Sequence, residues 1–221
     1  STKDSLSKIN IILYHLASGK TDTLGRGGND FRGFVFDESG SQLAFVAERD
    51  AEPKALQKFY KLWYYKDGMD TAVLLAEKNS VGMKLGMTIS ENGNPGFSKS
   101  GKHLFFGSSA IQPPKDTTLV EADLVKIDIW HYNDDYLQTQ QMVQLNNEQR
   151  RNFLSVYDLD KKSIEQLGSA DIPQVMQTGE GDGDTFVGIT DVGKRKESQW
   201  LGQTRKDIYV INVKDGSAKM V

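Results

Sequence analysis

Three histidines are the residues of this chain best suited to proton transfer near neutral pH: His15, His103 and His131. A catalytic triad requires one histidine held between a nucleophile and an orienting acid. We expect each histidine to lie inside a strand of a different repeat, so that the three imidazoles do not share a site. We therefore interpret them as strand residues whose ring nitrogens have structural partners, and we predict no catalytic residue among them.

A second group of chemically capable side chains follows one another closely in the chain: Asp128, His131, Asp134 and Asp135. Such a cluster could bind a metal ion or carry out acid–base chemistry. Adjacent residues of a strand point to opposite faces, however, so these carboxylates need not converge. We favour a structural interpretation, in which Asn133 or Asp134 caps a short helix near residues 134–150.

Carboxylates alternate with glycines in Glu180-Gly181-Asp182-Gly183-Asp184, a pattern that superficially suits calcium. An EF-hand loop needs a bidentate glutamate at its twelfth position. That position falls on Asp191 if Glu180 begins the loop, and on Gly193 if Asp182 begins it. We therefore favour a solvated hairpin turn, and we predict no metal ion and no other cofactor.

Charge and composition exclude several classes of function. The net charge of −3 over 221 residues gives no electrostatic case for nucleic acid, and we expect the one basic run, Lys194-Arg195-Lys196, to be a loop exposed to water. The absence of cysteine excludes disulfides and cysteine-ligated metals. No apolar run approaches the ~20 residues of a membrane span, and no signal peptide is visible. A start at Ser1 without Met is what we expect of a processed or trimmed chain.

The elements that must position these residues are two alternating types of hairpin. An inner type combines a Ser-Gly or Gly-Asp turn with a dense apolar strand, at 33–47, 96–107 and 181–190. An outer type has a polar turn between two amphipathic strands, at 10–24, 61–75, 153–167 and 208–221. Glycine between apolar strands is a strong hairpin signal, because it adopts the positive φ that the turn requires.

One inner and one outer hairpin make a four-stranded antiparallel sheet, which is one blade of a β-propeller. The sequence therefore predicts an all-β propeller fragment of about 3.5–4 blades in a single domain, 1–221. Its repeat units are roughly 1–30, 31–80, 90–170 and 172–221, with long loops at 48–58, 76–95 and 108–124. A β-sandwich also explains alternating hairpins, but not their alternation in type.

A family resemblance lies in the third repeat. Residues 125–141 read Val-Lys-Ile-Asp-Ile-Trp-His-Tyr-Asn-Asp-Asp-Tyr-Leu-Gln-Thr-Gln-Gln. This segment resembles the Asp-x-Trp-x-Tyr/Trp-x-Asp…Leu-Gln…Gln pattern in N-terminal propellers of bacterial serine peptidases of the prolyl oligopeptidase family. The hairpin at 153–167 resembles the family's next Tyr-Asp-Leu hairpin. The sequence Ser198-Gln199-Trp200-Leu201-Gly202 before Asp207 resembles its Trp-x-Gly…Asp-x-Tyr element.

The resemblance implies a non-catalytic propeller that covers an α/β-hydrolase domain and restricts which peptides reach it. The family's nucleophile lies in a Gly-x-Ser-x-Gly elbow, which this sequence lacks; in its nearest match, Gly96–Gly101, Ser100 replaces the second glycine. The resemblance also implies a periplasmic or secreted parent protein, although a cytoplasmic one is compatible with the sequence. Its partners would be the hydrolase domain and, through it, peptide substrates. Candidates for a propeller rim that contacts that domain are Trp130, Asp134, Asp135, Tyr136 and Gln138.

Two alternatives remain open at this stage. The first is a stand-alone propeller-like module that binds peptide, glycan or protein on loops at one face. The second is an enzyme in its own right, in which two carboxylates face each other across a cleft, as in glycosidases. We also expect strand edges left open by an incomplete ring to promote self-association.

Overall fold

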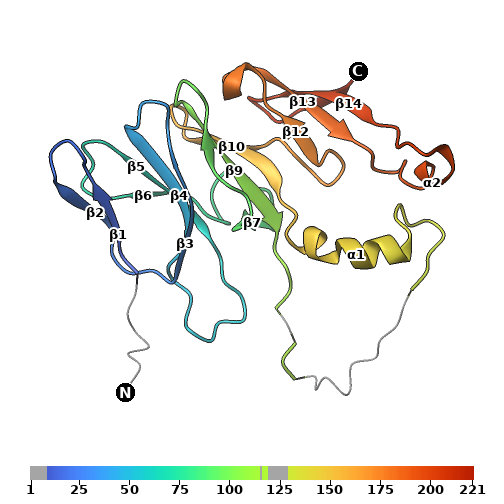
Figure 1. Ribbon diagram of the computed structural model, residues 1–221, viewed down its shortest axis with the longest axis horizontal. Coiled ribbons are helices and arrows are strands. Elements are labelled where there is room, and N and C mark those ends of the chain that lie inside the picture. The colour runs from blue at the N-terminus through green and yellow to red at the C-terminus, as the bar shows by residue number, and fades with distance from the viewer. Residues whose placement is uncertain (1–8, 115, 119–128) are drawn as a thin grey trace.

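The computed structural model describes residues 9–114, 116–118 and 129–221, and these residues form a mostly β structure (Figure 1). An N-terminal hairpin pairs β1 (Ile11–Tyr14) with β2 (Thr21–Gly25). Next comes a four-stranded antiparallel sheet, here called the first full sheet. It contains β3 (Asp30–Phe36), β4 (Gln42–Glu48), β5 (Lys61–Lys66) and β6 (Val73–Ala76), paired in chain order.

The second full sheet is arranged around the long strand β9 (His103–Ala110). One edge of β9 pairs with β10 (Phe153–Asp158), which continues to β11 (Ser163–Gln166). The other edge pairs with two short strands, β7 (Met87–Ile89) and β8 (Gly96–Phe97). The prediction that 76–95 is only a loop is therefore wrong, because β7 lies within it.

The third full sheet is again a four-stranded antiparallel meander. It contains β12 (Gln174–Met176), β13 (Thr185–Thr190), β14 (Asp207–Asn212) and β15 (Ala218–Met220). A 3₁₀ turn, Gly179–Gly181, connects β12 with β13, and a short helix, α2 (Ser198–Leu201), precedes β14. The alternation of inner and outer hairpins predicted from the turns is confirmed within the described residues.

Burial on both faces explains why the central strands read as dense apolar runs. Along β4, the side chains of Leu43, Phe45 and Ala47 pack toward the N-terminal hairpin. The alternate residues Ala44 and Val46 pack toward the second full sheet. A two-sheet sandwich buries one face of each sheet. Here the sheets form a series of face-to-face layers, which is consistent with a propeller fragment.

At the interface between the second and third full sheets, alternate residues of a central strand again pack on opposite faces. Phe105 of β9 packs against Phe186 of β13, with ring centroids 5.6 Å apart. Its neighbours Leu104 and Phe106 belong to the cluster on the opposite face. Figure 1 shows the N-terminal hairpin and the three full sheets side by side in chain order across the molecule.

The predicted helix near 134–150 is confirmed as α1 (Gln138–Gln149), but its predicted cap is wrong. The N-cap residue is Leu137, whose own side chain makes no capping hydrogen bond. Asp134 instead accepts a hydrogen bond from the side chain of Gln141, at 3.1 Å. The helix presents no buried residue, because it lies outside the sheet stack, below the second and third full sheets in Figure 1.

Candidate functional site

The segment 129–149 that carries the predicted rim residues is held to the third full sheet by Asp135. The Asp135 carboxylate accepts backbone hydrogen bonds from Gly193 (2.9 Å) and Arg195 (3.1 Å). The Arg195 guanidinium lies 3.4 Å from the same carboxylate and stacks over the Tyr136 ring, 4.4 Å from its centroid. Two of the five predicted rim residues therefore act as an anchor for the segment.

Arg195 was expected in a loop exposed to water, and this expectation is wrong. Its side chain is only 12% exposed, and it forms a second ion pair with Asp191 at 2.6 Å. Burial alone would lower the pKa of Arg195, but its hydrogen bond with Asp191 raises that pKa. Lys196 donates to the Tyr132 backbone carbonyl at 3.1 Å. The basic run thus binds the 129–149 segment to the third full sheet.

The remaining rim residues lie differently. Trp130 is 67% exposed. Tyr132 is also exposed, as are several apolar residues of α1 and its N-cap: Leu137, Met142, Val143 and Leu145. Gln138 is the first residue of α1. The Asp135–Arg195 anchor therefore holds a segment that presents aromatic and apolar side chains to the outside.

The histidines are brought to three separate places. His131 lies in the irregular segment before α1, not in a strand, and is 3.9 Å from Asp134. His15 directly follows β1 and lies 2.7 Å from Asp22 of the same hairpin. The expected strand position is correct only for His103, at the start of β9. Asp128 lies outside the described residues, so its relation to His131 is untested.

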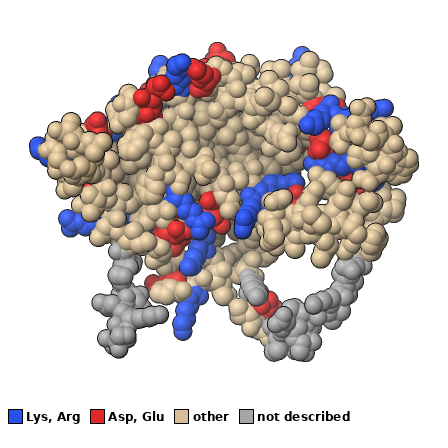
Figure 2. Space-filling model, in the orientation of Figure 1, with Lys and Arg blue, Asp and Glu red and all other residues tan. Residues whose placement is uncertain are grey.

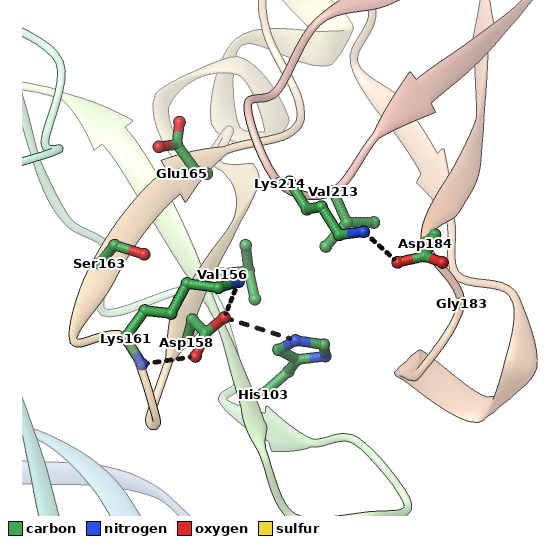
Figure 3. Close-up of a pocket in the computed structure, with 10 residues that line it drawn as sticks. All are labelled: His103, Val156, Asp158, Lys161, Ser163, Glu165, Gly183, Asp184, Val213 and Lys214. Carbon is green, nitrogen blue, oxygen red and sulfur yellow. Dashed lines mark hydrogen bonds and ion pairs between the residues drawn. The ribbon is translucent and has the colours of Figure 1, made fainter.

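His103 stands at the junction between the second and third full sheets, beside a cavity of about 50 Å³ (Figure 3). Its Nδ1 is 3.2 Å from the Gly181 carbonyl, and its Nε2 is 4.0 Å from Asp158. Burial works to raise the pKa of Asp158, but the hydrogen bond from Lys161 at 2.7 Å keeps that pKa below its usual range. His103, Asp158 and Lys161, which line this cavity, therefore already have partners.

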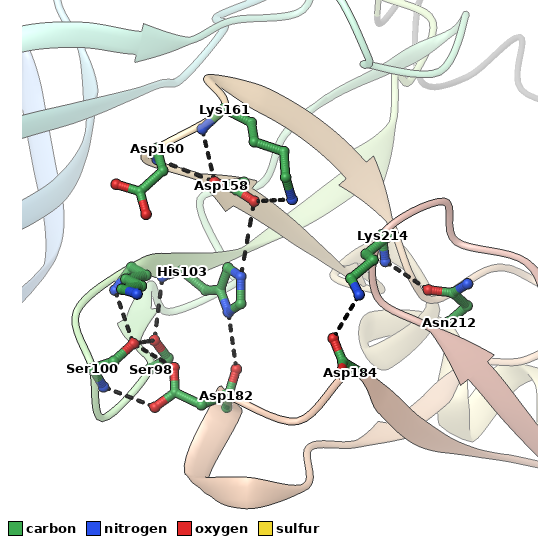
Figure 4. Close-up of polar contacts among 12 residues, drawn as sticks. Ser98, Ser100, His103, Asp158, Asp160, Lys161, Asp182, Asp184, Asn212 and Lys214 are labelled. Atoms are coloured by element: carbon green, nitrogen blue, oxygen red, sulfur yellow. Dashed lines mark hydrogen bonds and ion pairs between the residues drawn. The ribbon is translucent and has the colours of Figure 1, made fainter.

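The serines near His103 do not form a nucleophile–base pair with it. The Ser100 hydroxyl donates to Asp182 at 2.5 Å, and the Ser100 backbone N–H donates to the same carboxylate at 2.8 Å (Figure 4). Ser98 lies 3.3 Å from Ser100 and accepts the His103 backbone N–H. These contacts fasten the turn before β9 to the loop before β13, which is a structural function.

The three carboxylates of the calcium-like pattern at 180–184, for which we favoured a hairpin turn, each have a different partner. Glu180 pairs with Lys99 (2.5 Å), Asp182 bonds to Ser100, and Asp184 pairs with Lys214 (2.9 Å). Figure 4 shows Asp182 and Asp184 turned toward different partners. Among the residues that the structure describes, no group of three or more His, Asp or Glu side chains is arranged to hold a metal ion.

Charges on the molecular surface are mixed. On the face shown in Figure 2, Lys and Arg groups lie beside Asp and Glu groups rather than in one basic patch. No helix in the described part of the chain is long and apolar enough to cross a membrane.

The interactions that sequence reasoning missed are those between distant segments. Asp135 and Arg195 are 60 residues apart, and nothing local identifies them as partners. The sequence feature that could have indicated this contact was an acidic pair, Asp134-Asp135, in one irregular segment and the basic run 194–196 in another.

Comparison with known proteins yields no match to a family model and no match among curated sequences. Solved structures do match. A prolyl endopeptidase structure has a TM-score of 0.50 and 10% identity, over 98% of this chain and 25% of that one. The acylaminoacyl peptidase of Pyrococcus horikoshii (TM-score 0.44, 13% identity) is matched over 96% of this chain and 27% of its own. For Porphyromonas gingivalis dipeptidyl peptidase 4 (TM-score 0.41, 12% identity), the shares are 97% and 30%.

At these identities the likeness concerns the fold. This chain spans about a quarter of the length of the prolyl endopeptidase that it matches.

Proposed function

We propose that residues 1–221 are the non-catalytic β-propeller portion of a serine peptidase of the prolyl oligopeptidase type. The observation that carries this proposal is the series of stacked four-stranded antiparallel sheets, which is similar over nearly the whole chain to a quarter of a prolyl endopeptidase. The sequence pattern at 125–141 and the lack of a Gly-x-Ser-x-Gly elbow support it.

In this proposal the propeller restricts access to an α/β-hydrolase domain of the parent polypeptide. The 129–149 segment contributes to the rim that contacts that domain or its substrates. Trp130 is exposed there, while Asp135 and Tyr136 fix the segment in place. An exposed aromatic on a fixed support is suited to recognition, because little conformational entropy is lost on binding. We place the parent protein in the periplasm or outside the cell.

The test is size selection by the native, full-length protein. A short peptide and the same sequence inserted into a loop of a folded protein are offered in parallel, and kcat/KM is measured for both. We expect cleavage of the free peptide at least tenfold faster than cleavage of the loop. Trp130→Ala should reduce this discrimination, whereas Leu85→Ala, which alters an exposed residue outside the 129–149 segment, should not.

Two results would contradict the proposal. Equal cleavage of both substrates would exclude gating. A native protein without peptidase activity would favour the stand-alone binding module instead.

A further inference from the structure

The N-terminal hairpin is half of the unit that the rest of the chain repeats. In each full sheet, the second strand of an inner hairpin pairs with the first strand of an outer hairpin: β4 with β5, β9 with β10, and β13 with β14. Strand β1 occupies the place of β5, β10 and β14, but within the described residues its strand partner is β2 alone. One edge of β1 therefore has no strand partner in the part of the chain that the structure describes.

An apolar groove of about 530 Å³ lies beside this open edge. Its walls include Phe34 and Phe36 of β3, which are 52% and 50% exposed. Leu24 and Leu43 also line it and are fully or almost fully buried. Exposed aromatic rings beside buried leucines indicate an interface that is only partly covered.

The groove continues an interface that already exists. Leu24 and Leu43 belong to the hydrophobic cluster between the N-terminal hairpin and the first full sheet, and Ile11 and Leu13 of β1 pack against the same cluster. The ring of Phe34 lies 5.4 Å from that of Phe45, another member. The groove is therefore a part of this interface that the described residues leave uncovered.

The opposite side of β3 shows what covers such a position. There β3 contacts β8, the inner strand of the second full sheet. An added carbon atom at Gly33 would lie 2.6 Å from Pro95, just before β8. The repeat therefore places an inner hairpin against β3 on one side, and the groove leaves the equivalent place open on the other.

We propose that this groove is the seat of a further inner β-hairpin, supplied by a segment of the parent polypeptide outside residues 1–221. Its second strand pairs with the open edge of β1, antiparallel, and completes a four-stranded sheet. Its apolar side chains cover Phe34 and Phe36. The inference rests on the proposed function for the existence of that parent polypeptide.

Photo-crosslinking in the native, full-length protein tests this proposal. Phe34 is replaced by p-benzoylphenylalanine, which preserves the aromatic ring, and the crosslinked peptides are identified by mass spectrometry. We expect an intramolecular crosslink to a segment outside 1–221 that contains two apolar strands around a glycine turn. The same probe at the exposed residue Leu85 should give no crosslink to that segment.

Three outcomes would overturn the proposal: a crosslink to residues 1–8, a crosslink to a second copy, or a native chain that contains no residues beyond 1–221. A crosslink to the expected hairpin in a native protein without a serine elbow would reject the proposed function while retaining this inference. A second variant, Phe34→Asp, should lower the unfolding midpoint of the native protein more than Leu85→Asp does.

Discussion

At the scale of single residues, Asp135 is the most consequential side chain of the 129–149 segment. It accepts two backbone hydrogen bonds from the loop of the third full sheet and faces the Arg195 guanidinium. Its neighbour Asp134 is the natural comparison, because it is bonded to Gln141 within its own segment.

We predict that Asp135→Ala releases the segment from the sheet. Hydrogen bonds to charged groups contribute about 1.5–3 kcal/mol each, and the variant also leaves Arg195 without one of its acidic partners. Limited proteolysis should cut between residues 129 and 149 faster in Asp135→Ala than in the parent chain. Asp134→Ala serves as the control, and equal cleavage of the two variants would contradict the anchor.

Asp158 gives a prediction for pH dependence. Despite burial, the hydrogen bond from Lys161 holds its pKa below the ordinary value of about 4. Its contribution to stability is therefore complete above that ordinary value and disappears as the pH falls through the lower, folded value. Asp158→Asn should destabilise the protein at pH 7, and the difference from the parent chain should shrink at pH 3.

Urea unfolding at both pH values measures this effect. Asp160→Asn, in the same turn with an exposed side chain, is the control. A destabilisation by Asp158→Asn that is equally large at pH 3 and pH 7 would show that its charge is not involved.

The roles of individual polar residues were harder to predict than their positions. The sequence correctly placed His103 in a strand, but its neighbours Gly181 and Asp158 come from two different sheets. Likewise, the rim segment reads locally as a strand and a helix cap, whereas contacts about 60 residues away determine its structure. Such contacts have no local signature.

At the scale of elements, Gly107 of β9 allows the backbone of the second full sheet's central strand to approach the backbone at Gly93 closely. A carbon atom added at Gly107 of β9 would lie 2.7 Å from the Gly93 Cα and 2.7 Å from the Asn152 side-chain oxygen. Gly96 of β8 has open space at the same position. The two glycines therefore respond differently to the same substitution.

We predict that Gly107→Ala lowers the free energy of unfolding by about 1–3 kcal/mol, because backbone atoms must move. Gly96→Ala should change it by less than about 1 kcal/mol. Thermal and urea unfolding of the two variants provide the comparison. Equal stability of the two variants would contradict the close approach of Gly107 to the Gly93 backbone.

Hairpins were the most predictable elements, because their signals are local. A turn with glycine between two apolar strands identifies both strands and their pairing, as in β3–β4 and β14–β15. Strand β7 was missed because Met87-Thr88-Ile89 is short and pairs directly with β9, although β8 lies between the two strands in the sequence. The order of sheets followed from the alternation of hairpin types, whereas the contacts between sheets did not.

At the scale of the whole molecule, both ends of the sheet series present apolar surface. Phe34 and Phe36 are half exposed at the N-terminal end, and Ile208, Val210 and Met220 are exposed on the third full sheet. Uncovered sheet faces and edges favour association with other chains.

We therefore predict that the 221-residue chain alone self-associates as its concentration rises. Sedimentation velocity should show a rising weight-average mass, and Phe34→Asp should reduce that rise more than Leu85→Asp does. A single monomeric species at all concentrations would argue against incomplete end faces.

The central claim is that this chain is the propeller portion of a larger serine peptidase. The most direct measurement is labelling of the native protein with a fluorophosphonate, followed by intact mass determination and identification of the labelled peptide. We predict a polypeptide several hundred residues longer than 221, labelled on a serine within a Gly-x-Ser-x-Gly sequence outside this region. A native chain of these 221 residues, or a label within them, would contradict the account.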